Sequence, residues 1–220
     1  MVINNRKNDM LVEREIAKFL DKHLYSDNTA FKQCLRTDDI NQQLEGSDII
    51  VTTINDDLND AVVDEKVAVT QANKPLKTFA LELSFIGRSK IKRCGWFIDK
   101  NKKTEYYLIG WINKADIPYN TQKGKWETDL IREDNIKELE WALVSRKKIF
   151  DFLIERGWTL ERIIKQEEKI RKNKSVKTKE FINDVSFRYS DAYIEKPINI
   201  LLKRETYLNL ADYKGIISNT

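Results

Sequence analysis

An acidic pair and a lysine on two neighbouring segments are the residues of this sequence best suited to chemistry. Asp48 lies near the start of one strand-like run, and Asp64 and Lys66 lie in the next. Because side chains alternate along a strand, Asp64 and Lys66 share one face and Glu65 points to the other. Asp48 lies beside Asp64 if the turn between the two runs sets that register.

Two carboxylates at this spacing need a cation between them. Side by side, the charges of Asp48 and Asp64 repel each other, and a hard divalent cation with oxygen ligands relieves that repulsion. We therefore expect a magnesium ion here, with manganese as its substitute. Lys66 is then placed to orient or deprotonate a water molecule, or to offset charge that develops on a phosphate. The alternative is an acidic hairpin whose charges face solvent.

The scarcity of histidine and cysteine excludes several other kinds of active site. The single histidine, His23, falls in a helical pattern, where we expect a surface or packing role. Two cysteines, Cys34 and Cys94, cannot form a disulfide framework or a zinc cluster. Hydrolytic chemistry would therefore depend on carboxylates, lysines and a bound metal.

Composition indicates a globular cytoplasmic protein. The chain has 39 basic and 35 acidic residues, and the net charge of +4 singles out no partner. Hydrophobic residues make up 41% of the chain and charged residues 34%, a balance typical of folded domains. No apolar run approaches the ~18 residues that span a bilayer, and the polar start predicts no signal peptide, so we expect no membrane contact.

Hydrophobic periodicity predicts the elements that must position the acidic pair. Apolar residues recur every three or four positions over 11–24, which predicts a helix with Glu13 in or beside its apolar face. A carboxylate at that place has to be solvated, paired or bound to a cation. Runs rich in β-branched and aromatic residues predict the strands of one sheet, which are 31–36, 47–54, 61–70, 78–86, 95–98 and 106–112.

Helical spacing dominates the C-terminal half. From Arg132 apolar residues recur at helical intervals as far as Gly157, and a further helix is expected over 159–173. The run 194–204 is predicted to be an edge strand, because Pro197 cannot donate a hydrogen bond to a neighbouring strand.

The order of these elements and the residues on them resemble one enzyme superfamily. The segment 11–86 is similar to the PD-(D/E)XK nucleases, and in particular to uncharacterised phage and bacterial members. In that family a helix carrying a glutamate precedes a hairpin with an aspartate on one strand, and the next strand bears Asp or Glu, any residue, then Lys. One departure is Ser47, which precedes the aspartate in place of proline. The matching positions are Glu13, Asp48 and Asp64-Glu65-Lys66.

The resemblance implies a restriction-endonuclease-like α/β fold. Residues 1–220 would form one domain, with a mixed sheet flanked by helices as its core over about 11–115. A helical and edge-strand extension would follow over about 130–220, which makes the C-terminal half helical.

The resemblance also implies a metal-dependent endonuclease that hydrolyses DNA phosphodiester bonds. Asp48 and Asp64 would bind magnesium, and Glu13 would complete the metal site. Lys66 would help to activate the attacking water.

Two further residues are candidates for the same site. Glu82 would be an additional ligand if its strand lies next to Asp64. The alternative, which we favour, is a buried Glu82 paired with Arg88 or Lys90. Gln43 would face the substrate.

Basic residues gather in two segments that could contact DNA phosphates. One follows the run 78–86 and the other belongs to the helix predicted over 159–173, although solvated helix and loop faces are the alternative. Tryptophans can stack on single-stranded bases, but Trp96, Trp111 and Trp141 are expected in the core. The predicted DNA contacts are Arg88, Lys90, Lys92, Arg93, Arg171, Lys172 and Lys174.

Two other classes of protein remain open. A non-catalytic nucleic-acid-binding or inhibitory protein could retain the nuclease fold, although an intact acidic pair would then repel phosphates without any benefit. In a protein that only binds other proteins, the hairpin charges could be ordinary solvent-exposed side chains. Asp64 and Lys66 would then face bulk solvent far from Asp48. Cleavage of both strands of DNA would favour a homodimer.

Overall fold

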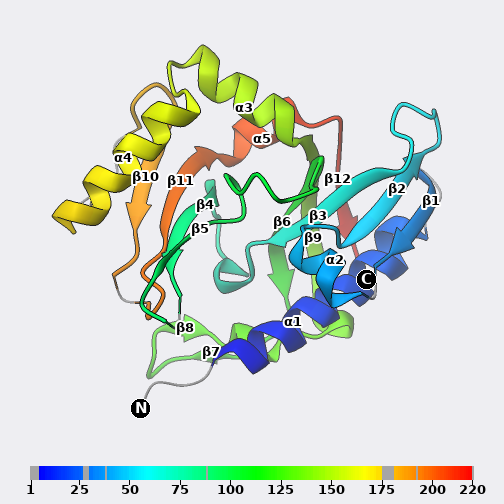
Figure 1. Cartoon of the computed structure of the whole chain (residues 1–220). Helices are drawn as coiled ribbons and strands as arrows, with labels where there is room; N and C mark the ends of the chain where they lie inside the picture. The colour runs from blue at the N-terminus through cyan, green and yellow to red at the C-terminus, as the bar shows by residue number, and fades with distance from the viewer. Residues whose placement is uncertain are drawn as a thin grey trace.

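Two β-sheets, each built from strands of both halves of the chain, form the frame of the molecule (Figure 1). The computed structural model describes residues 5–26, 30–37, 39–87, 89–174, 181–191 and 193–219. In these residues the larger, six-stranded sheet contains, in spatial order, β1 (Phe31–Arg36), β2 (Ile49–Thr53), β3 (Ala61–Val67), β6 (Tyr106–Ala115), β9 (Ile136–Ser145) and β12 (Tyr213–Ser218). The smaller sheet contains β10 (Ser186–Tyr189), β11 (Ile198–Lys203), β4 (Thr78–Ile86) and β5 (Lys92–Cys94). A short ribbon consists of β7 (Tyr119–Asn120) and β8 (Lys125–Trp126).

Helices pack against both sheets. Those described are α1 (Asn5–Leu20), which continues into a π-helical turn (Asp21–Tyr25), α2 (Ile40–Leu44), α3 (Arg146–Glu155), α4 (Leu160–Asn173) and α5 (Arg204–Leu210). Figure 1 shows α1 on one side of the larger sheet and the other three long helices on the opposite side. Among the described residues, no helix combines the length and the apolar character that a membrane span requires.

The six-stranded sheet is buried on both faces. One face packs against α1 in a cluster that includes Ile16, Val63 and Leu108. The other face packs against the smaller sheet and α3, α4 and α5 in a second cluster that includes Tyr107 and Ile109. Consecutive residues of β6 therefore enter different cores, which explains why that strand is apolar without interruption.

The larger sheet is mixed, as predicted, and the α/β class is confirmed. β1, β2 and β3 are antiparallel, β3 and β6 are parallel, and β6, β9 and β12 are antiparallel. A parallel pair needs a crossover connection, and the segment between β3 and β6 provides it. That segment carries β4 into the smaller sheet, so the prediction of one continuous sheet was wrong. The run 78–86 is a strand of the other sheet, and 95–98 forms a turn after β5.

The prediction of helix from Arg132 onward is wrong as far as residue 145, because β9 occupies that region. Leu139 and Leu143 fit a helical spacing, but Ala142 and Val144 are buried as well. A strand covered on both faces produces such a pattern, and periodicity alone cannot distinguish it from a buried helix. The helix over 159–173 was predicted correctly, and the rest of the C-terminal half alternates strands with α5.

The strand expected at an edge is internal. β11 pairs with β10 on one side and with β4 on the other. Pro197 precedes the first paired residue, Ile198, so its missing N–H lies outside the ladder and removes no hydrogen bond from it. The edges of the larger sheet are β1 and β12.

Candidate active site

The hairpin of β2 and β3 places Asp48 opposite Asp64. Ile49 is the ladder partner of Val63, and the Asp48 N–H donates to the Val63 carbonyl at 3.0 Å. The paired ladder ends at Ile49 and Val63, and the next residues, Asp48 and Asp64, are joined through their carboxyl groups, as the sequence led us to expect.

The turn of the hairpin fixes that register. Its Asp56 and Asp60 have positive φ angles of 56° and 50°, a region that aspartate tolerates better than most residues. The buried Leu58 accepts a backbone hydrogen bond from Thr53 at 3.0 Å and anchors the turn in the core.

Asp48, Asp64 and Lys66 form one connected cluster. The two carboxyl groups share a hydrogen bond. Asp48 Oδ2 also accepts from the Glu65 N–H at 2.8 Å, and Lys66 Nζ donates to Asp64 Oδ1. Asp64 is only 3% exposed, which excludes a solvated acidic surface at this position.

Burial and charge shift the ionisation of this cluster. Burial is the main cause that raises the pKa of Asp48 to about 7, a net value in which Lys66 lowers the pKa and the neighbouring Asp64 carboxylate raises it. Burial would lower the pKa of Lys66, but the charges of Asp64 and Asp48 outweigh it and the pKa is raised. Lys66 is therefore a protonated hydrogen-bond donor at neutral pH, not a base.

A cavity of about 870 Å³ opens beside this cluster. Asp48 and Lys66 form part of its wall, together with Glu13 of α1, Gln43 of α2 and Trp96 from the turn after β5. Helix α1, the hairpin and the turn after β5 thus converge on one space. Glu13, Gln43, Asp48 and Lys66 of the predicted site line it, whereas Asp64 and Glu82 do not.

Glu13 shares this cavity without completing a three-carboxylate group. It is exposed on α1 and its charge contributes to the raised pKa of Lys66. Within the part of the chain that the structure describes, no three Asp, Glu, His or Cys side chains lie close enough together to hold a metal ion. The pair Asp48 and Asp64 is therefore the centre of the site.

Gln43 and Trp96 both line the cavity of the predicted site. Gln43 Nε2 donates to the Thr37 carbonyl at 2.7 Å, which fixes the amide on the cavity wall. Trp96 was expected in the core, as Trp111 and Trp141 are, but it is only partly buried. Its ring centroid lies 5.5 Å from Lys66 Nζ.

Glu82 does not lie on a strand next to Asp64, because β4 belongs to the smaller sheet. Burial and the charge of Glu195 together raise the pKa of Glu82 to about 7, against the lowering effect of Lys66 and Lys102. Its carboxylate accepts from the Trp96 N–H. Lys66 is thus among the charges that act on Glu82, although the two residues come from different sheets.

The raised pKa of Glu82 predicts that the stability of the fold depends on pH. The folded form of Glu82 binds its proton more tightly than the unfolded form, so the free energy of unfolding should fall as pH rises from about 4.5 to about 7. Chemical denaturation in EDTA across this range should show a fall of up to about 3 kcal/mol from this group. Glu82→Gln should remove the part of the pH dependence that comes from Glu82 and leave the part that comes from Asp48. The control Glu161→Gln, at an exposed position, should leave the pH dependence of the unfolding free energy unchanged. An unaltered pH slope in Glu82→Gln would contradict the assignment.

An ion-pair network on the wall of the same cavity was not predicted, and Asp21, Arg36 and Glu65 belong to it. Arg36 of β1 donates to Asp21 Oδ1 at 2.6 Å and to Glu65 Oε2 at 2.8 Å, and Tyr25 OH donates to Glu65 Oε1 at 2.8 Å. Because the N–H of Glu65 also donates to Asp48, the network fixes the backbone that orients the acidic pair. The residues lie far apart along the chain, so no sequence pattern links them.

The two predicted basic segments meet in the structure. Lys92 Nζ donates to Glu167 Oε2 at 2.6 Å, and Arg171 Nε donates to Glu167 Oε1 at 3.3 Å. Glu167 is buried, so Lys92 links β5 to α4 in addition to any role with DNA. Arg171 lies on α4 with Glu167 and also donates to the hydroxyl of Ser84 on β4. Arg88 lies outside the described residues. The remaining predicted contacts are exposed, and these are Lys90, Arg93, Lys172 and Lys174.

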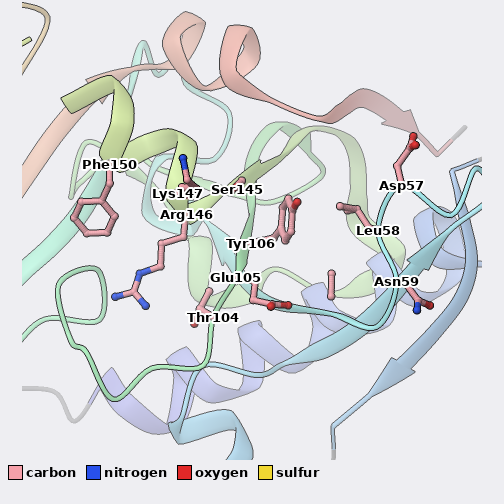
Figure 2. Close-up of a pocket in the computed structure, with 11 residues that line it drawn as sticks. Asp57, Leu58, Asn59, Thr104, Glu105, Tyr106, Ser145, Arg146, Lys147 and Phe150 are labelled. Carbon is pink, nitrogen blue, oxygen red and sulfur yellow. The ribbon is translucent and has the colours of Figure 1, made fainter. Parts of the chain in front are cut away.

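A second cavity of about 580 Å³ lies beside the β2–β3 turn and the start of α3, and Figure 2 shows its lining residues. Glu105 and Tyr106 form part of its wall. The guanidinium of Arg146 donates to the carbonyls of Phe97 and Asp99 at 3.0 and 2.9 Å, so it stabilises the turn after β5. None of the predicted site residues lines this space, which leaves the first cavity as the candidate site.

Comparisons with family models, with curated proteins and with solved structures gave no match. The assignment of a function therefore depends on the sequence and geometry of this chain.

Proposed function

We propose that this protein is a metal-dependent endonuclease that hydrolyses phosphodiester bonds of DNA on a restriction-endonuclease-like core. The observation that carries the proposal is the pair formed by the partly buried Asp48 and the buried Asp64, held together with Lys66. Asp48 and Lys66 lie on the wall of a large cavity. A surface protein has no evident use for two adjacent desolvated carboxylates, because burying them destabilises the fold.

The donor set suits a magnesium ion. Mg²⁺ commonly binds through one or two carboxylates and keeps waters and substrate phosphates as its other ligands. Asp48 and Asp64 would hold it, with Glu13 on the same cavity wall, and Mn²⁺ would substitute. The raised pKa of Asp48 fits this assignment, because a cation would replace the proton that Asp48 otherwise holds. A bound ion supplies Lewis-acid assistance to phosphodiester hydrolysis.

The chain's own residues orient the site and balance its charge. The ammonium of Lys66 is protonated, so it can donate a hydrogen bond to a phosphate oxygen and offset negative charge that develops there. The Glu65 N–H holds Asp48, and Arg36 holds the Glu65 side chain. These contacts keep the acidic pair in place before any substrate binds.

The exposed cations of β5 and α4 would contact the DNA backbone away from the reacting phosphate. Each phosphate contact makes binding more sensitive to salt, so DNA affinity should fall steeply between 50 and 200 mM salt, a range in which several contacts remove orders of magnitude.

A cleavage assay tests the proposal. Supercoiled, linear, single-stranded and branched DNA should each be incubated with the protein in Mg²⁺, in Mn²⁺ and in EDTA. We expect cutting in Mg²⁺ or Mn²⁺ and none in EDTA. Folded protein that cuts no substrate in either metal would overturn the proposal and favour the non-catalytic nucleic-acid-binding protein. If both strands of a duplex are cut together, sedimentation should show a homodimer.

A further inference from the structure

Trp96 lines the cavity beside the proposed reacting centre. The ammonium of Lys66 lies 5.5 Å from its ring centroid, and both residues line the same cavity. The ring is therefore close enough to contact the nucleotide whose phosphate lies against Lys66.

The ring is held rigidly from behind. Tyr107 and Phe97, both fully buried, contact it at centroid distances of 5.1 and 6.3 Å with steep interplanar angles of 63° and 79°. The backbone is fixed as well, because Gly95 N–H donates to the Leu83 carbonyl at 2.8 Å. A rigid aromatic ring loses little conformational entropy when a ligand stacks on it.

Close packing at Gly95 makes this position of the ring possible. A Cβ atom there would lie 2.3 Å from the Glu82 carbonyl oxygen, a distance that no side chain can occupy. Glycine therefore lets the turn approach β4 closely, and it brings Trp96 to the cavity wall.

The rest of the cavity suits a nucleobase beside a phosphate. Val67 and Val69 form apolar wall near the hairpin, whereas Asp48 and Lys66 supply the polar groups. A volume of about 870 Å³ is in the range of pockets that enclose a drug-sized molecule, so a nucleotide fits.

We infer that Trp96 is a stacking platform for the base next to the scissile phosphate, and that the site therefore acts on single-stranded or unpaired DNA. Inside a duplex the face of each base is covered by its neighbours, and only an unpaired or extruded base exposes it. Stacking on an aromatic ring is tolerant of sequence, because every base has a π-face. This inference deepens the proposed function and rests on it for the identity of the scissile phosphate.

Binding measured without catalysis tests the inference. Fluorescence anisotropy in EDTA should compare a labelled single strand with the same sequence in a duplex. We expect the wild-type protein to prefer the single strand, and Trp96→Leu to lose about 5- to 100-fold of that affinity with duplex binding unchanged. Trp96→Phe should retain most of it. Trp126→Leu removes another partly buried tryptophan, outside this cavity, and should bind as the wild type does.

Two results would overturn the inference. One is duplex binding as tight as single-strand binding, and the other is unchanged single-strand affinity in folded Trp96→Leu. If Trp96→Leu does not fold, the quenching of tryptophan fluorescence by single-stranded DNA should be measured in the wild type and in Trp96→Phe. Equal quenching in these two proteins would show that the base does not stack on Trp96. If the wild-type protein cleaves no substrate but still binds single strands through Trp96, the nuclease proposal is refuted and Trp96 remains a binding residue. Metal-dependent duplex cleavage that Trp96→Leu does not alter would refute the inference and leave the nuclease.

Discussion

Asp64→Asn should remain folded and lose cleavage by at least about 10³-fold, because the amide cannot replace a carboxylate as a ligand for a hard cation. The loss corresponds to several kcal/mol of transition-state stabilisation, at about 1.4 kcal/mol for each factor of ten. The fold should survive, since Lys66 still has Asp48 as a partner and one of two repelling charges has gone. We expect the free energy of unfolding to stay within about 1 kcal/mol of the wild-type value.

The matched control for this variant is Asp56→Asn in the same hairpin. Asp56 has a φ of 56°, which asparagine also adopts, and its ion pair with Lys32 is exposed. Single-turnover cleavage in Mg²⁺ should be normal for Asp56→Asn. Full cleavage by Asp64→Asn would disprove the assignment of the site.

Lys66→Met should lose both cleavage and stability. It leaves the carboxyl groups of Asp48 and Asp64 side by side without a cation, and removing one partner of a buried charge cluster typically destabilises a fold by about 3–5 kcal/mol. The loss should be largest at neutral pH and should shrink as pH falls toward about 4, because a buried acid with a raised pKa is stabilised in its protonated form. Added Mg²⁺ should raise its melting temperature more than that of the wild type.

A double variant separates these two effects. Asp64→Asn combined with Lys66→Met removes one negative and one positive charge, so it should recover much of the stability and none of the cleavage. Denaturation and single-turnover assays on the three proteins measure the coupling directly. The exposed Lys100→Met serves as the control. Equal stability of Lys66→Met and wild type at pH 7 would show that the ion cluster is not coupled to folding.

The hairpin was predictable because its information is local. Alternation along a strand places Asp64 and Lys66 on one face, and the short turn leaves few registers in which Asp48 meets them. The helix bearing Glu13 was predictable for the same reason, since α1 presents its apolar positions at regular intervals to a single sheet face.

Features that depend on tertiary contacts were not predictable. β9 has apolar residues on both faces, so Leu139 and Leu143 fitted a helix equally well. Trp96 resembled a core residue by type, and only the close approach of Gly95 to β4 places it at the cavity. Arg36 joins Asp21 and Glu65 across three elements, a set that no spacing rule selects.

The strand order also bears on whether the residues of the site can be separated from the rest of the chain. The hairpin, the helix with Glu13 and the turn with Trp96 all lie within the first 115 residues, which invites their use as a minimal fragment. Yet β6 borders β9, and β4 borders β11, so each of the two sheets is completed by two strands from the C-terminal half, β9 and β12 in one and β10 and β11 in the other. A chain cut after residue 115 would expose two long apolar edges that favour self-association. Translation must therefore reach β12 before the proposed site has its full framework.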